Sequence, residues 1–291
     1  MSSAVYTSSQ QRSPRHIIPD LIRYRRLLLD VVSKELRARY RNAMMGFLWA
    51  VLQPVLMMLI LTFVFGFLLQ GIVASKGIAT ERSYAVFLLC GLVPWQFMAS
   101  ALSRGAGSLP ENQDLIKKVH FPREIIPLAA VINCVINVLI GFVTLFVVLA
   151  LLEGIGMIGR GVLYVPIIFA VEFALAAGLA LLFSALNVYY QDIAYLIEVA
   201  LAFGFYATPI LYPLPKSMAV LPVSPGLQHW LYELYLLNPM ANLIVAFRQA
   251  ILDNVFPDPI LLLRPAIIAA GALLLGAITF RRAAPTFADY L

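Results

Sequence analysis

The chain has 291 residues, of which 62% are hydrophobic and 12% are charged, whereas an ordinary soluble domain has about 25% charged residues. The net charge of +6 would suggest nucleic-acid binding in a soluble protein, but most Lys and Arg residues here flank apolar segments, where topology and anionic lipid explain them. Cys90 and Cys134 both lie in apolar segments and form neither a disulfide framework nor a metal site. The composition therefore predicts an integral membrane protein.

The N-terminal part contains two segments of different character. Residues 1–19 are polar, lack the apolar core of a signal peptide, and are predicted to be a disordered cytoplasmic tail. In residues 20–40 apolar positions recur at spacings of three and four between Arg and Lys, which predicts an amphipathic helix in the membrane interface. A cytosolic helix that packs on a partner fits the same pattern. Residues 20–291 are predicted to form one transmembrane domain.

Residues 46–69 contain no charge over 24 positions and follow nine Lys or Arg residues. A helix needs roughly 20 apolar residues to cross a bilayer. Further spans are predicted at 84–103, 125–152, 162–188, 193–212 and 260–280. With both termini cytoplasmic, the inner segments hold 15 Lys and Arg residues and the outer segments hold 6, as the positive-inside rule requires. The predicted fold class is an all-α integral membrane protein with six transmembrane helices.

The segment before the last span has a composition of its own. Residues 214–238, within the region 213–259, are rich in Pro, Tyr and Trp, and such amphipathic aromatic residues favour the membrane–water boundary. Residues 240–252 are apolar except for Arg248, but they are too few to cross the bilayer. We expect an extracytoplasmic re-entrant cap here.

Motifs of enzymes that use nucleotides or metals are missing from the sequence. It contains no Gly-Lys dipeptide and hence no Walker A loop, no His or Cys cluster with zinc spacing, and no paired Asp motif for Mg²⁺. We therefore predict no catalytic residue and no metal site, and a transport subunit rather than an enzyme. An integral-membrane enzyme of polyprenyl-glycan metabolism is an alternative, but it would need such a constellation.

The loop after the second predicted span contains signals for a short helix. Pro110, Glu111 and Asp114 suit its first turn, and Lys117 and Lys118 suit its last turn, since acids favour the positive end of the helix dipole and bases the negative end. Such a helix could dock a soluble partner. A plain connecting loop is the alternative.

Several segments resemble one family. Residues 115–127, LIKKVHFPREIIP, closely resemble the second cytoplasmic segment of ABC-2 type permeases that export polysaccharides such as O antigen, capsule and teichoic acid. Residues 39–49 with Pro54, 91–95, 207–213 and 237–240 also resemble family segments and occur in the same order. Tyr190-Gln191-Asp192 departs from the Tyr-Arg-Asp that is frequent in the family.

The resemblance implies one half of a homodimeric pore in the bacterial inner membrane, which moves a lipid-linked polysaccharide. Two copies of a separate ATPase would bind ATP and Mg, and this chain would hold no cofactor. The ATPase would dock on the loop helix, for which the candidate residues are Glu111, Asn112, Asp114, Lys117 and Lys118. A permease for small-molecule or drug efflux is an alternative within the family.

Aromatic side chains can stack on the C–H faces of sugars and so line a path for a polymer. Tyr195 and Tyr206 are 11 residues apart and share a helix face, and the other aromatic candidates are Trp49, Phe63 and Phe203. Two acids lie within spans, Glu172 and Glu198, and we expect Glu198 to face the path. A buried acid bonded to a neighbouring helix is the alternative.

Three arginines precede the first span at the depth of the inner headgroups. Arg37, Arg39 and Arg41 could bind the diphosphate of a lipid carrier, because a guanidinium can hold phosphate through two hydrogen bonds. Anchoring of the span by the positive-inside rule explains the same residues without a ligand.

Overall fold

The computed structural model describes residues 23–40, 48–68, 83–118, 121–213 and 224–290, and all regular elements among them are helical. The α-helices are α2 (Arg25–Tyr40), α3 (Leu48–Leu61), α5 (Tyr84–Glu111), α6 (Gln113–Lys118), α7 (Ile125–Glu153), α8 (Val165–Tyr189), α9 (Asp192–Ala207), α11 (Pro225–Tyr235), α12 (Pro239–Ile251), α13 (Pro259–Ala283) and α14 (Phe287–Tyr290). A π-helical segment, Thr62–Leu68, continues α3, and 3-10 turns lie at Ile155–Met157, Arg160–Tyr164 and Ala284–Thr286.

Four helical stretches within the described residues are long and apolar enough to cross a membrane: Tyr84–Glu111, Ile125–Glu153, Arg160–Tyr189 and Pro259–Thr286. They correspond to the second, third, fourth and sixth predicted spans. The first predicted span contains α3 and its π-helical continuation, and the fifth contains α9, both of which are shorter. The chain is therefore a multi-pass membrane protein, while the count of six spans stays a prediction.

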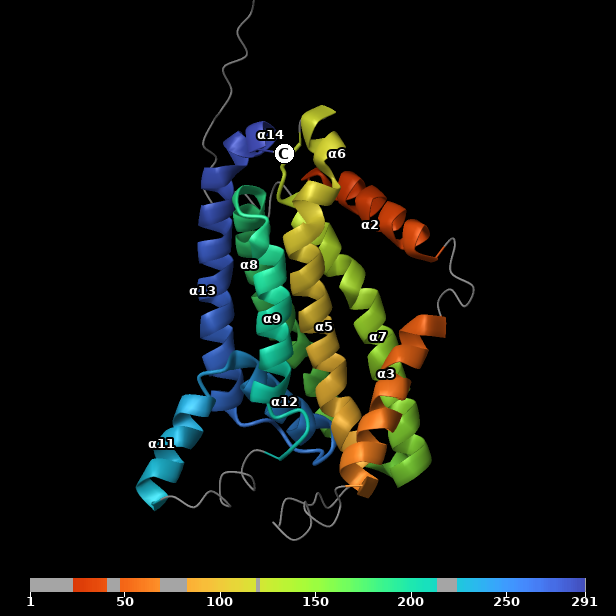
Figure 1. Cartoon of the computed structure of the whole chain (residues 1–291). Coiled ribbons are helices and arrows are strands. Elements are labelled where there is room, and N and C mark those ends of the chain that lie inside the picture. The colour runs from red at the N-terminus through yellow and green to blue at the C-terminus, as the bar shows by residue number, and fades with distance from the viewer. Residues whose placement is uncertain (1–22, 41–47, 69–82, 119–120, 214–223, 291) are drawn as a thin grey trace, which may run out of the picture.

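The long helices α5, α7, α8 and α13 and the shorter α9 run lengthwise through the molecule (Figure 1). At one end, α6, α14 and the C-terminus lie close together, and α2 lies across this end at a large angle to the long helices (Figure 1). The helices α11 and α12 lie at the opposite end. Helices α2, α6 and α14 thus share one end of the molecule, while the cytoplasmic location of this end stays a prediction.

Small residues allow α5, α8 and α13 to approach closely. A Cβ atom on Gly276 of α13 would lie 2.2 Å from the carbonyl oxygen of Gly178 on α8. A Cβ atom on Gly105 of α5 would lie 2.5 Å from the Cβ atom of Ala180 on α8. In membranes, helices associate largely through such close van der Waals contact, because lipid provides no hydrophobic driving force between them. These contacts place α8 between α5 and α13.

A buried arginine fixes the end of the bundle opposite α6. Arg248 of α12 donates through Nη1 to the Pro209 carbonyl at 2.5 Å and through Nη2 to the Ile210 carbonyl at 2.7 Å. Its guanidinium carbon also lies 3.5 Å from the centroid of the Phe87 ring of α5. Burial lowers the pKa of Arg248 to about 10, so that it stays protonated at neutral pH. Arg248 therefore ties α12 to α5 and to the chain that follows α9.

Candidate functional site

The predicted docking helix is α6, but it begins later than the sequence suggested. Helix α5 continues through Pro110 and ends at Glu111, and the C-cap residue Asn112 separates it from α6. The prediction that Pro110 begins the short helix is therefore wrong. Asp114 does lie in the first turn of α6, and Lys117 and Lys118 lie in its last turn, as the dipole argument required.

A contact from α8 explains why α5 does not stop at Pro110. Proline has no N–H to donate to the carbonyl four residues earlier, which here belongs to Ala106. The side chain of Asn187 provides the missing donor, since its Nδ2 lies 3.0 Å from the Ala106 carbonyl oxygen. The Oδ1 atom of Asn187 accepts from the backbone N–H of Ala194 in α9 at 3.2 Å. One amide thus joins α5, α8 and α9.

The outer surface of α6 carries charges of both signs. Glu111, Asp114, Lys117 and Lys118 are exposed, and Nζ of Lys118 lies 3.6 Å from Oδ1 of Asp114. These two side chains are 75% and 88% exposed, so their ion pair contributes little to stability. Asn112 instead turns inward and donates from Nδ2 to the Ser108 carbonyl at 2.9 Å. The surface is thus available for a complementary charged partner.

The inner side of α6 rests on the C-terminal segment. Ile116 is buried in a cluster that includes Phe280 and Phe287. Beside this cluster, Nε of Arg281 lies 2.9 Å from Oε1 of Glu124, and both side chains are only 11% exposed. Sequence reasoning counted Arg281 as a topology signal and missed this pair, because no local pattern relates residues 157 positions apart.

Arg123, in the turn between α6 and α7, holds the same segment. Its guanidinium donates to the Ala284 carbonyl and lies 6.0 Å from the centroid of the Phe287 ring. Burial lowers the pKa of Arg123, and the carboxylate of Asp289 acts in the opposite direction. The turn, α6 and the C-terminal helix α14 therefore form one packed unit.

The predicted interface helix α2 packs against α7. Val31 and Val32 are buried in a cluster with Ala129, and Asn133 of α7 donates to the carboxylate of Glu35. Among the three arginines that we proposed for lipid phosphate, Arg37 is exposed. The side chain of Arg39 and the whole of Arg41 lie outside the described residues, so the phosphate site stays a prediction.

The predicted path residues are exposed on two helices that both pack against α5. Tyr195, Glu198, Phe203 and Tyr206 are exposed on α9. Trp49 is exposed on α3, and Phe63 is exposed on its π-helical continuation. The contact between α9 and α5 is close, since a Cβ on Gly204 would lie 2.8 Å from the Trp95 ring. The structure therefore places aromatic side chains on uncovered surfaces of two segments that pack against α5, namely α9 and α3 with its continuation.

The two acids within predicted spans have different surroundings. Glu198 is exposed on the same helix as the aromatic candidates, whereas Glu172 of α8 is fully buried. Neither carboxylate oxygen of Glu172 has a hydrogen-bond partner among the residues that the structure describes. Glu172 is thus buried on α8 and does not belong to the exposed aromatic surface of α9.

Comparison with known proteins identifies the family. The family model described as ABC-2 type transporter matches residues 27–252. The O-antigen export system permease protein RfbA of Myxococcus xanthus is 27% identical over 273 residues, which cover 94% of this chain and 98% of that protein. An RfbA of Klebsiella pneumoniae is 29% identical and covers 78% of this chain and 81% of its own length. The polysialic acid transport protein KpsM of Escherichia coli is 23% identical, with 85% and 90% covered.

Proposed function

Since the chain belongs to the ABC-2 type transporter family, we propose that it is the permease subunit of an exporter that moves a lipid-linked polysaccharide across the bacterial inner membrane. The names of three relatives support the substrate class, because they describe O-antigen export and polysialic acid transport. The chain has no Walker A loop, so ATP with its Mg would be bound and hydrolysed by a separate ATPase subunit.

The observation that carries the proposal is the form of α6. It presents exposed charges of both signs at one end of the bundle, while Ile116 fixes its inner side to the C-terminal segment. A short helix with a rigid base can transmit force from a soluble partner to the helices behind it. We assign Glu111, Asp114, Lys117 and Lys118 to contact with the ATPase, and Asn112 to the position of the helix.

The exposed aromatic residues suit the path for the polymer. Sugar rings have apolar C–H faces on which Tyr, Phe and Trp can stack without holding one sugar tightly. Tyr195, Phe203 and Tyr206 of α9 would form one wall with Glu198 among them. Trp49 of α3 and Phe63 of its π-helical continuation would contribute from another segment that packs against α5. A second copy of the chain would close the path, which gives a homodimer with two ATPase subunits.

The arginines near α2 would serve the lipid carrier. A polyprenyl diphosphate has its charge at the level of the inner headgroups, and α2 lies at the same end of the bundle as α6 (Figure 1). Arg37, Arg39 and Arg41 would bind this diphosphate while the glycan enters the path.

Co-purification tests the proposal. The tagged chain is expressed in a host that makes a candidate ATPase partner and is extracted in mild detergent. We expect a stoichiometric ATPase with the wild-type chain and none when residues 114–118 are scrambled. The matched control is the double variant Arg264→Glu/Glu233→Arg, which exchanges the charges of a partly exposed ion pair away from α6. In the wild type, Nη2 of Arg264 lies 2.8 Å from Oε2 of Glu233. A folded wild-type chain that retains no ATPase, or polysaccharide export without the chain, would refute the proposal.

A further inference from the structure

One face of α5 is uncovered and differs from the uncovered faces of its neighbours. Between residues 96 and 107, all of which the structure describes, the exposed or half-buried positions recur every three to four residues on one helix face, and none carries a large apolar side chain. Ser103 and Arg104 are exposed, and Gln96, Ala99, Ser100 and Gly107 are half-buried. On α7, the exposed positions are instead all large and apolar: Leu139, Val143, Val147, Leu151 and Leu152. A lipid-facing surface is apolar, as on α7, so this face of α5 meets something other than lipid.

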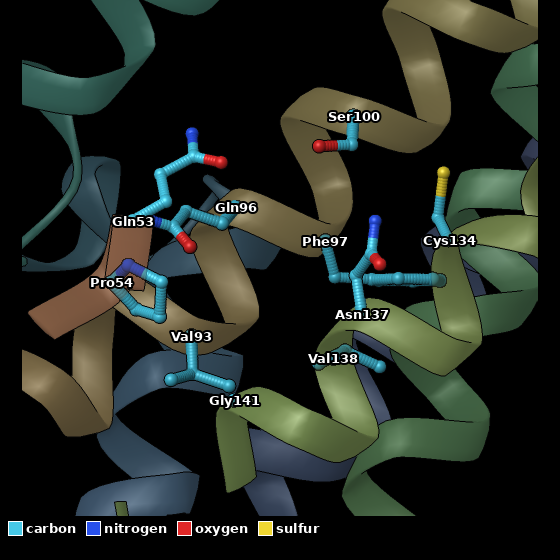
Figure 2. Close-up of a pocket in the computed structure, with 10 residues that line it drawn as sticks. All are labelled: Gln53, Pro54, Val93, Gln96, Phe97, Ser100, Cys134, Asn137, Val138 and Gly141. Atoms are coloured by element: carbon cyan, nitrogen blue, oxygen red, sulfur yellow. The ribbon is translucent and has the colours of Figure 1, made fainter. Parts of the chain in front are cut away.

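The polar face of α5 borders a cavity between α3, α5 and α7. Figure 2 shows the lining side chains, among which Gln53, Gln96, Ser100 and Asn137 have carboxamide or hydroxyl groups. Gln53 is exposed, so the cavity opens toward the surface on the side of α3. The cavity is therefore a polar recess that three helices build together.

The recess lies near the middle of the bundle. Gln96 is about 18 Å from the start of α5, and Asn137 is about 18 Å from the start of α7, at 1.5 Å per residue. The two helices are 28 and 29 residues long, so both side chains lie well inside their helices. Polar side chains at this depth of a membrane protein usually face protein or water rather than lipid.

The chemistry of the lining selects an uncharged, hydroxyl-rich ligand. No Asp, Glu, Lys, Arg or His lines the cavity among the described residues, so it offers no counter-charge for a phosphate. A carboxamide donates two hydrogen bonds and accepts others, and a hydroxyl does both, which matches the rim of a sugar ring. The helices α9 and α3, which both pack against α5, carry exposed aromatic residues. These aromatic side chains suit the apolar faces of a sugar ring, whereas the polar groups of the cavity suit its rim.

We infer that the recess formed by Gln53, Gln96, Ser100 and Asn137 is a contact site for the uncharged sugar units of the polymer during transport. The inference rests on the proposed function, since it assigns the polar side of the same path. Several weak hydrogen-bonding groups suit conduction, which requires binding that is readily released. Gln53 and Gln96 are the residues expected to contribute most, because their side chains are long and accessible.

Accessibility to a charged thiol reagent tests whether water reaches the recess. Gln96→Cys and Ser100→Cys are made separately in a Cys90→Ala/Cys134→Ala background, in the complete transporter in membrane vesicles. The control is Leu139→Cys, which is on the same helix as Asn137, two residues away, and 55% exposed on an apolar face. We expect a membrane-impermeant methanethiosulfonate to react at least tenfold faster at positions 96 and 100 than at 139. Equal or slower reaction at both positions would overturn the inference.

An export assay tests the contact between the recess and the polymer. The Gln53→Leu/Gln96→Leu variant keeps side-chain size but removes both carboxamides, and we expect at least a tenfold loss of export with normal abundance and normal ATPase co-purification. Leu139→Ala is the control and should export normally. If the wild type exports polysaccharide and the double variant does so at the same rate, the inference is wrong while the proposed function stands. If the wild type exports none, both are wrong.

Discussion

Asn187 is expected to be a major determinant of stability, because two helices depend on its amide. In Asn187→Ala, the Ala106 carbonyl loses its donor, and Pro110 cannot replace it. The Ala194 N–H at the start of α9 loses its acceptor as well. Leaving a buried polar group unsatisfied costs about 1–3 kcal/mol. Since Asn187 is buried and Ala194 only partly so, we expect Asn187→Ala to destabilise the protein by about 2–4 kcal/mol.

A second substitution isolates the contribution of the Ala106 carbonyl. Pro110→Ala restores an N–H at the position where a helix donates to that carbonyl. In the Pro110→Ala background, Asn187→Ala should therefore cost about 1–2 kcal/mol less than in the wild type, a coupling energy typical of groups in direct contact. The remaining cost would come from the Ala194 N–H, which loses its acceptor in both backgrounds.

The four proteins of this cycle are compared by thermal unfolding in one detergent, with unfolding rates at a fixed temperature where unfolding is irreversible. Asn112→Ala is the control, because Asn112 also donates to a backbone carbonyl but is less buried than Asn187. Its effect should be smaller and should not depend on Pro110→Ala. An equal cost of Asn187→Ala in both backgrounds would refute the reasoning.

Three further variants test other contacts. Arg248→Met should destabilise by about 3 kcal/mol or more in thermal unfolding, because the Pro209 and Ile210 carbonyls lose charged donors; an unchanged melting temperature would contradict this. Gly178→Ala should lower the yield of folded protein in size-exclusion chromatography, because the new Cβ would lie 2.4 Å from the backbone nitrogen of Leu273; a wild-type elution profile would show that α8 and α13 can separate at no cost. Glu172→Leu should keep or raise the melting temperature, since neither carboxylate oxygen is hydrogen-bonded among the described residues; loss of export at normal abundance would instead give Glu172 a role in transport.

The sequence predicted the long helices well, because length and hydropathy determine which segments can cross a bilayer. It failed at the end of α5, because a tertiary contact determines where this helix ends. The Pro110 signal is local and usually ends a helix or begins one, whereas the Asn187 amide, 77 positions away, lets α5 continue. Arg248 was visible as the one charge in an apolar segment, but its carbonyl partners depend on how α12 packs.

The candidate site shows the same division. The charges of α6 follow from spacing and the helix dipole, so the sequence located them. Their support by the Glu124–Arg281 pair and by Phe287 could not be predicted, since it requires the C-terminal segment to fold back on the loop. The spacing of Tyr195 and Tyr206 predicted that they share a helix face, but their exposure depends on how α9 packs and could not be read from the spacing. The polar recess was not predicted, because its lining comes from three helices.

The continuity of α5 connects these parts physically. The helix runs from Tyr84 past the recess at Gln96 to Glu111, and Asn112 alone separates it from α6. If the ATPase docks on α6 as proposed, a displacement of α6 reaches the recess through a single helix, provided that α5 stays unbroken at Pro110. Because the Asn187 amide maintains α5 there, Asn187→Ala should lower export per ATP hydrolysed, and Pro110→Ala should restore it. Loss of export in proportion to ATP hydrolysis would place the defect in assembly rather than in this helix.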